Sequence, residues 1–173
     1  INGQGLDTSK SSSVAIISRA TEINAGLYAQ DLTVIAGSNR VGSDGSVTPI
    51  AGTDSTPRIA VDTGSLGGMY ANRIHLVSSD KGVGVNLGNL NARQGDIQLD
   101  VNGKLTLNNT LAQGAIMANA DELALTGNHK ATGDIRLSSK GNTQLKQGVI
   151  SSGNNVLLNS QGQLTLNDSV VAA

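Results

Sequence analysis

Residues 95–107 read GDIQLDVNGKLTL, two short runs in which apolar residues stand two apart. This alternation is typical of a β-strand that buries one face. Both patterns return later in the chain: Gly-Asp-Ile-x-Leu begins again at Gly133, and Gly-x-Leu-Thr-Leu-Asn, which begins at Gly103, begins again at Gly162. No long stretch keeps the 3.6-residue period of a helix. The sequence therefore predicts an all-β fold built from repeats.

The repeats define three sets of apolar residues, each recurring at a period of about 20 residues, within the range of repeat architectures. The sets are Ile97, Ile116, Ile135 and Val156; Leu107, Leu125, Leu145 and Leu166; and, more loosely, Leu111, Ala131, Ile150 and Val171. The pattern extends backwards by one further period, since Ile74 and Leu76 align with Ile97 and Leu99, and Val83 and Val85 align with Leu105 and Leu107. Segments that look like earlier, less regular rungs are Val14–Ile17 and Leu32–Ile35.

Three apolar registers at one period indicate the three faces of a coil whose rungs stack like on like. Strand spacing is about 4.8 Å, so roughly eight rungs would form a short rod. Parallel connections of this kind are right-handed. The prediction is a right-handed parallel β-helix (β-solenoid) with about 20 residues per rung. It forms a single domain over 1–173, with its most regular repeats over 95–173.

One segment interrupts this rhythm. Residues 37–58 contain both prolines of the chain, Pro49 and Pro57, and few apolar positions. Val41 and Val47 flank Asp44-Gly45, a pair typical of a hairpin turn. We expect this segment to leave the coil as a hairpin or an ordered loop.

The composition argues against several classes of function. Twelve basic and 13 acidic residues give a net charge of −1, which does not favour a nucleic-acid-binding protein. The only aromatic residues are Tyr28 and Tyr70, too few in sequence for a base-stacking platform or an aromatic sugar-binding cleft. Cysteine is absent, so thiolate chemistry is excluded.

Candidate catalytic groups are few and scattered. His75 is expected to face outward between two inward neighbours, and His129 is expected to be exposed at a turn. Asp96 and Asp134 could lie two rungs apart on one edge, a weak candidate for a carboxylate pair; as residues that follow glycine, they are more typical of turns. The densest charged neighbourhood is Arg58, Asp62, Arg73, Asp80 and Lys81, for which we expect solvated ion pairs at the foot of the excursion. No catalytic, cofactor or metal site is predicted.

Four segments carry a resemblance to a known family: Ile16–Ala20 (IISRA), Asp31–Gly37 (DLTVIAG), Val61–Ile74 (VDTGSLGGMYANRI) and Leu76–Val85 (LVSSDKGVGV). Together they resemble the filamentous hemagglutinin type of large exoprotein, including the contact-dependent growth inhibition exoproteins. The most specific block is Gly67, Gly68, Met69, Tyr70, Ala71, Asn72, Arg73 and Ile74, which we interpret as a structural motif of the family.

The resemblance implies a protein secreted to the cell surface of a Gram-negative bacterium by two-partner secretion, with an outer-membrane barrel transporter as its partner. That family's secretion domain usually has an Asn-Pro-Asn-Gly type motif upstream, and this chain has no Asn-Pro pair. We therefore expect the later part of a secretion domain, running into the first filament repeats, excised from a longer exoprotein.

The expected function is non-enzymatic: a structural β-helix segment of an adhesin or a contact-inhibition effector. A first alternative is direct binding of a glycan or receptor on a host or neighbouring cell through residues 37–58. A second is a polysaccharide lyase or hydrolase on the same fold. The fragment alone is expected to be a monomer with some end-to-end association through its open rungs.

Overall fold

The computed structural model describes every residue from 1 to 173 and contains strands and turns throughout. The strands are β1 (Leu6–Asp7), β2 (Ser13–Ser18), β3 (Thr21–Ile23), β4 (Gly26–Tyr28), β5 (Asp31–Ala36), β6 (Asn39–Val41), β7 (Val47–Pro49), β8 (Ile59–Thr63), β9 (Gly68–Ala71), β10 (Arg73–Ser78), β11 (Gly84–Ala92), β12 (Ile97–Val101), β13 (Lys104–Ala112), β14 (Ile116–Ala120), β15 (Glu122–Ala131), β16 (Ile135–Ser139), β17 (Thr143–Ser152), β18 (Val156–Ser160), β19 (Leu164–Asn167) and β20 (Val170–Ala172). The chain has no helix that could span a membrane.

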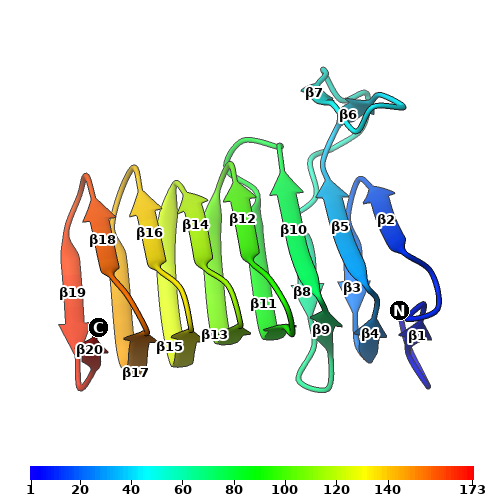
Figure 1. Cartoon of the computed structure of the whole chain (residues 1–173). Helices are drawn as coiled ribbons and strands as arrows, with labels where there is room; N and C mark the ends of the chain where they lie inside the picture. The colour runs from blue at the N-terminus through cyan, green and yellow to red at the C-terminus, as the bar shows by residue number, and fades with distance from the viewer.

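Two parallel sheets wind around one core and form a β-solenoid. One sheet runs β18-β16-β14-β12-β10-β5-β2, and the other runs β1-β4-β9-β11-β13-β15-β17-β19, with β3, β8 and β20 beside this path. In Figure 1 the first sheet rises on the near side, and the chain returns downward on the far side while advancing from right to left, which is a right-handed coil. The predicted β-helix is confirmed.

The long strands of the second sheet give the coil its third face. Strands β13 and β15 pair in register up to Leu107 and Leu125, shift, and resume at Thr110 and His129. The shift marks a corner, so each long strand contributes one segment to each of two faces. With the first sheet these segments enclose a continuous core of 33 buried apolar residues.

The first two predicted apolar sets stack as expected. Ile97, Ile116, Ile135 and Val156 are consecutive register partners on the first sheet. The second sheet holds a matching column of register partners, Leu107, Leu125, Leu145 and Leu166. Each rung alone buries too few side chains to be stable, and stacking supplies the missing contacts. Ile74 and Leu76 also pair with Ile97 and Leu99, and the earlier rungs pair as Val14 with Leu32 and Ile16 with Val34.

The pairing predicted for Val83 and Val85 is wrong by two residues, which is one repeat of the inward–outward alternation. Val85 pairs with Leu105, and Leu87 pairs with Leu107. Val83 lies in the turn before β11, where it is buried outside the stacked pair. The spacing between these rungs is therefore shorter than the alternation of apolar residues suggests.

The third predicted set is also wrong at its first two members. The inward column on this face runs Leu90, Thr110, His129, Ile150 and Val171. Leu111 therefore points outward and is 40% exposed, while Ala131 belongs to the next inward column with Ala112 and Ala92. The corner between the two faces differs in length by one residue from β13 to β15. A fixed spacing counted along the chain therefore assigns the wrong residues to the inward column of this face.

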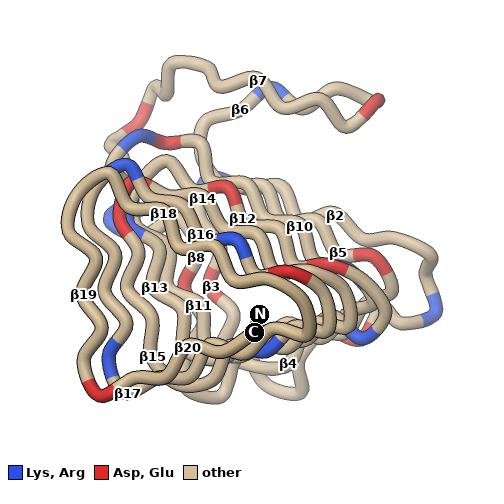
Figure 2. The backbone as a smooth tube through the Cα atoms, turned by 60° about the vertical axis from the view of Figure 1, so that its left-hand side comes forward, with Lys and Arg blue, Asp and Glu red and all other residues tan.

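The predicted hairpin leaves the coil within the segment 37–58. Strands β6 and β7 pair antiparallel, with Asn39 opposite Pro49 and Val41 opposite Val47. Gly45 of the Asp44-Gly45 turn has φ of +81°, a conformation that glycine adopts without strain. Both views show the hairpin projecting beyond the edge of the coil (Figures 1 and 2).

Candidate functional site

The segment Gly67–Ile74 carries the chain around a corner from the second sheet to the first. It includes β9, passes Asn72 and enters β10. Met69, Ala71 and Ile74 are buried in the core, whereas Arg73 is exposed. We refer to Gly67–Ile74 as the corner motif.

The corner motif attaches to a rung far back in the chain, since Arg73 and its partner Asp31 are 42 residues apart. Other neighbouring rungs pair at about half that separation, but here the hairpin excursion intervenes. The contacts form an unbroken series: Met69 with Leu27, Tyr70 with Tyr28, Asn72 N–H with the Gln30 carbonyl, Arg73 with Asp31, and Ile74 with Leu32. Through these pairs the rung after the excursion stacks directly on the rung before it.

Two glycines make this close approach possible. A Cβ on Gly67 would overlap the carbonyl oxygen of Ile23 on the preceding rung, so a side chain cannot be accommodated there without moving backbone. A Cβ on Gly68 would meet the ring of Tyr70. The absence of a side chain thus lets the backbone of the preceding rung approach Gly67 and lets the ring of Tyr70 pack over Gly68.

Arg73 and Asp31 form a two-pronged ion pair across the same two rungs. Arg73 Nε donates to Asp31 Oδ1 over 3.0 Å, and Nη2 donates to Oδ2 over 2.9 Å. The hydrogen bonds and charge of Asp31 raise the pKa of Arg73. Because both side chains are largely exposed, the pair fixes orientation more than it adds stability. Sequence reasoning missed Asp31 as a partner, although its separation from Arg73, two periods, was a usable signal.

A second polar cluster holds the foot of the hairpin. Asp80 accepts hydrogen bonds from Arg19 Nε through Oδ2 and from the Ser38 N–H through Oδ1, each over 2.9 Å. The Asp80 side chain is only 13% exposed. An ion pair at the foot of the excursion was predicted, but its partner is Arg19, and Arg73 belongs to the corner motif instead.

A shallow groove of about 380 Å³ runs beside the hairpin, from Pro49 across the ends of the rungs to Lys140. Its walls are mainly short uncharged polar residues such as Ser79, Asn102 and Asn119. Charged residues are scattered over turns and edges of the coil rather than gathered on one face (Figure 2). The groove's two charged lining residues are Asp100 and Lys140.

The two histidines differ from each other. His75 is exposed as expected, with its Nε2 3.9 Å from Asp100 Oδ2. The prediction for His129 is wrong: its side chain lies in the inward column and the residue is 2% exposed. His129 Nδ1 and Thr110 Oγ1 share a hydrogen bond of 2.9 Å, and His129 Nε2 is buried without a partner. Burial lowers the pKa of His129 to about 4.

Asp96 and Asp134 act as turn residues, each bonded to the next rung. Asp96 Oδ1 accepts from the Ala115 N–H over 2.7 Å, and Asp134 Oδ1 accepts from the Asn155 N–H over 3.2 Å. A whole rung separates the two carboxylates, because Asp96 precedes Ile97, Asp134 precedes Ile135, and Ile116 pairs with both isoleucines. No group of three or more His, Asp or Glu side chains is placed to hold a metal ion.

Comparison with known families finds two that together cover most of the chain. Residues 1–107 match the TPS secretion domain, and residues 100–168 match the haemagglutinin repeat. No solved structure was found to match.

Individual relatives are long proteins that this chain matches over a small part. A tRNA nuclease CdiA of Yersinia mollaretii is 56% identical over all 173 residues, which span 6% of that protein. A 16S rRNA endonuclease CdiA of Enterobacter cloacae is 54% identical over the whole chain and 5% of its own length. A tRNA nuclease CdiA-2 of Burkholderia pseudomallei is 50% identical over 107 residues, 61% of this chain and 3% of that protein.

Proposed function

Because the chain belongs to the TPS secretion domain family, we propose that it serves a mechanical role, joining the secretion domain of a large exoprotein to the start of its filament. The chain is a structural β-solenoid segment of a secreted two-partner exoprotein, displayed on the surface of Gram-negative bacteria. Its export by that system implies an outer-membrane transporter as partner.

The observation that carries the proposal is the continuity of the coil where the two family matches meet. Strand β13 (Lys104–Ala112) lies across the end of the secretion-domain match and the start of the repeat match. It pairs in parallel with β11 on one side and β15 on the other. Secretion domain and repeats share one core, which supports treating 1–173 as one folded unit with residues 37–58 as a side branch.

Within this unit we assign the corner motif a structural role. The motif's contacts with Leu27, Tyr28, Asp31 and Leu32 support this, since they are the contacts that resume the coil after the hairpin. The role needs no ligand.

Enzymatic activity belongs, in this proposal, to other parts of the parent protein. The nuclease names are those of relatives of which the chain spans only 6% and 5%. Whether the parent acts as an adhesin or a contact-inhibition effector is set by regions outside these residues. Contact with a host or neighbouring cell is assigned to those regions too.

We infer that the isolated chain is a monomer with some tendency to associate end to end. This inference rests on the C-terminal rung, where Leu164, Leu166 and Val170 are 42%, 47% and 56% exposed. Strand edges and apolar side chains there can pair with another chain.

The test is the export of the parent exoprotein with a charge placed inside the coil. Leu107→Asp buries a carboxylate in the core, whereas Leu111→Asp makes the same change on the same strand at an outward position. We infer further that folding outside the cell helps to draw the chain across the membrane, so Leu107→Asp should lower the secreted amount and Leu111→Asp should not. Normal secretion of Leu107→Asp, with its rungs shown to be misfolded by protease sensitivity, would contradict the proposal.

A further inference from the structure

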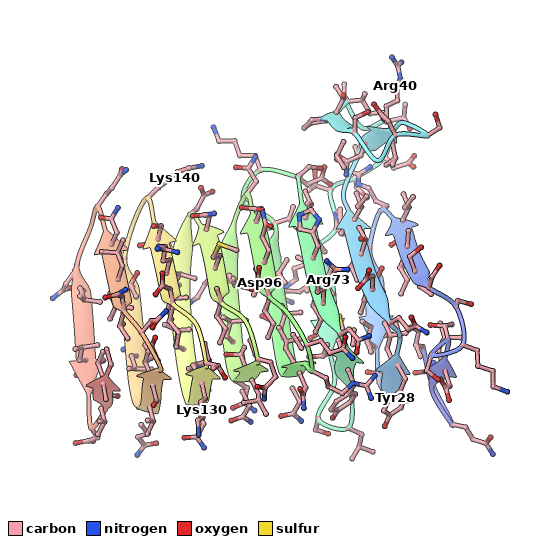
Figure 3. All side chains as sticks on the ribbon, in the orientation of Figure 1. Tyr28, Arg40, Arg73, Asp96, Lys130 and Lys140 are labelled. Atoms are coloured by element: carbon pink, nitrogen blue, oxygen red, sulfur yellow. The ribbon has the colours of Figure 1, made fainter.

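The only two aromatic residues of the chain lie together on the outer surface of the coil. Tyr28 and Tyr70 are register partners on neighbouring rungs, and their rings stack with centroids 5.1 Å apart and planes 17° apart. Tyr28 is 41% exposed. Figure 3 shows Tyr28 and Lys130 projecting from the same lower face of the coil. The expectation from composition, that two tyrosines could form no aromatic platform, overlooked this stacking.

Each ring is seated by a glycine two residues before it. A Cβ on Gly26 would meet the ring of Tyr28, and a Cβ on Gly68 would meet the ring of Tyr70. The Gly-x-Tyr pattern therefore occurs on two successive rungs, as Gly26-Leu27-Tyr28 and Gly68-Met69-Tyr70. An aromatic ring laid over a strand glycine is held in place by the sheet, so the platform is fixed before any ligand arrives.

A hollow of about 420 Å³ begins at Tyr70 and continues over the next rungs. Asparagines at one outward position line it: Asn109 Nδ2 donates to Asn89 Oδ1 over 3.1 Å, and the Asn128 N–H donates to Asn109 Oδ1 over 3.0 Å. The second outward position supplies Asn91, opposite Tyr70, followed by Leu111 and Lys130. The hollow thus combines an aromatic wall, amide groups, one exposed apolar side chain and one ammonium group.

This combination fits few kinds of ligand. No carboxylate lines the hollow and Lys130 is its only charged residue, so neither a metal ion nor a nucleic acid, which needs several cations, matches it. The hollow lies on the face of a sheet whose backbone groups are already paired, so an added peptide strand has no edge to bind.

A sugar ring matches both kinds of surface. Its C–H face packs on an aromatic ring, and its hydroxyl groups exchange hydrogen bonds with amides, which both donate and accept. Rungs about 4.8 Å apart would meet successive units of an extended pyranose chain. We propose that the strip formed by Tyr28, Tyr70, Asn89, Asn91, Asn109, Leu111 and Lys130 is a binding site for a neutral oligosaccharide lying along the coil axis.

Intrinsic tyrosine fluorescence tests the proposal directly, because the chain has no tryptophan and both tyrosines lie in the strip. The chain is titrated with maltohexaose, cellohexaose and chitohexaose, and binding is measured independently by isothermal titration calorimetry. We expect a saturable change in emission with at least one of the three sugars. No saturable response with any of them would overturn the proposal.

Variants locate the site. Tyr70→Phe keeps the ring and should bind within about threefold of the unaltered chain, whereas Tyr70→Leu should weaken binding about tenfold, the loss expected for one aromatic contact. Asn91→Ala, at a position remote from the core, should also weaken it. His75→Ala, on the outer face of the other sheet, is the matched control and should bind normally. Binding that survives both Tyr70→Leu and Asn91→Ala would place the sugar elsewhere and overturn the assignment.

Discussion

His129 occupies the inward column between Thr110 and Ile150, where water cannot reach its ring. One ring nitrogen is satisfied by Thr110, while Nε2 has no partner. Protonation would place a charge in this apolar column, and that desolvation is the main cause of a pKa of about 4. At this position the fold depends on a neutral imidazole.

The stability of the chain should therefore fall as the pH drops from 6.5 to about 4. The unfolded chain binds a proton at His129 below its ordinary pKa of 6.5, whereas the folded chain binds it only near 4. The lost stability approaches about 3 kcal/mol, from about 1.36 kcal/mol per pKa unit, and does not grow further once the folded chain is also protonated. Urea unfolding followed by circular dichroism at neutral pH and at successive steps down to the folded-state pKa measures this change.

The double variant Thr110→Val/His129→Leu separates His129 from other groups. Its stability should be nearly constant over that range, while His75→Ala should keep the full dependence because it leaves His129 and Thr110 in place. Asp7, Asp44 and Asp134 add a dependence of their own only as the pH nears their ordinary pKa of 3.8, because hydrogen bonds from Ser9, Ser46 and Asn155 lower their pKa values in the folded chain; the comparison with the double variant is therefore made above that range. An unchanged pH dependence in the double variant would contradict the account of His129.

Gly67 offers a second prediction for a single residue. Gly67→Ala should destabilise the chain by roughly 1–3 kcal/mol, because the added methyl group overlaps the Ile23 carbonyl and forces the two rungs apart. Gly84→Ala is the control, since its Cβ would lie 3.4 Å from the flexible end of Ile59. Thermal unfolding compares them, and equal midpoints for both variants would show that the corner motif does not require the close approach.

The hairpin β6–β7 is the element least tied to the coil. It pairs with neither of the parallel sheets, and its foot is held by Asp80 through Ser38 and Arg19. Deleting Gly42–Ser55 keeps these anchors and should leave the far-ultraviolet spectrum and the cooperativity of unfolding intact, with a midpoint shift of a few degrees at most. Loss of cooperative unfolding would mean that the hairpin is part of the folding unit.

The elements differ in how far the sequence predicts them. The column from Ile97 to Val156 follows the chain at nearly constant spacing because each member begins a short strand after a similar turn. On the face after the corner, the register shifts between Leu107 and Thr110, so Leu111 and His129 exchange the environments expected of them. The turn-forming residues Gly127 and Asn128 next to His129 suggest an exposed turn and do not indicate that the His129 side chain is buried.

The corner motif illustrates the same limit for the site. Its residues could be singled out, but their partners depend on how the chain returns from the excursion at 37–58. The one sequence signal that indicates Tyr28 as the partner of Tyr70 is the repeat of Gly-x-Tyr at twice the rung period. The alternation of apolar residues does not indicate which rungs pair over such a separation. The contacts between the rungs on either side of the excursion depend on how these rungs stack, which the local sequence pattern does not specify.

At the scale of the whole molecule, we expect the repeat rungs that follow residue 107 to be interchangeable. Ile116 and Ile135 are register partners on consecutive rungs, so removing 116–134 takes out one complete rung and leaves Ile135 in the place of Ile116. Repeat proteins tolerate such changes because each rung contacts only its neighbours. Residues 1–107 are not interchangeable in this sense, since they match the secretion domain.

The central claim is that one coil combines an export region with the first rungs of a filament, and secretion of the parent exoprotein by its own transporter tests it most directly. The amount in the medium is measured for the intact exoprotein, for a variant lacking 1–107 and for a variant lacking 116–134. We predict that the first deletion abolishes export, while the one-rung deletion is exported at close to the normal level. Export without residues 1–107, or its loss on removing a single rung, would contradict the account.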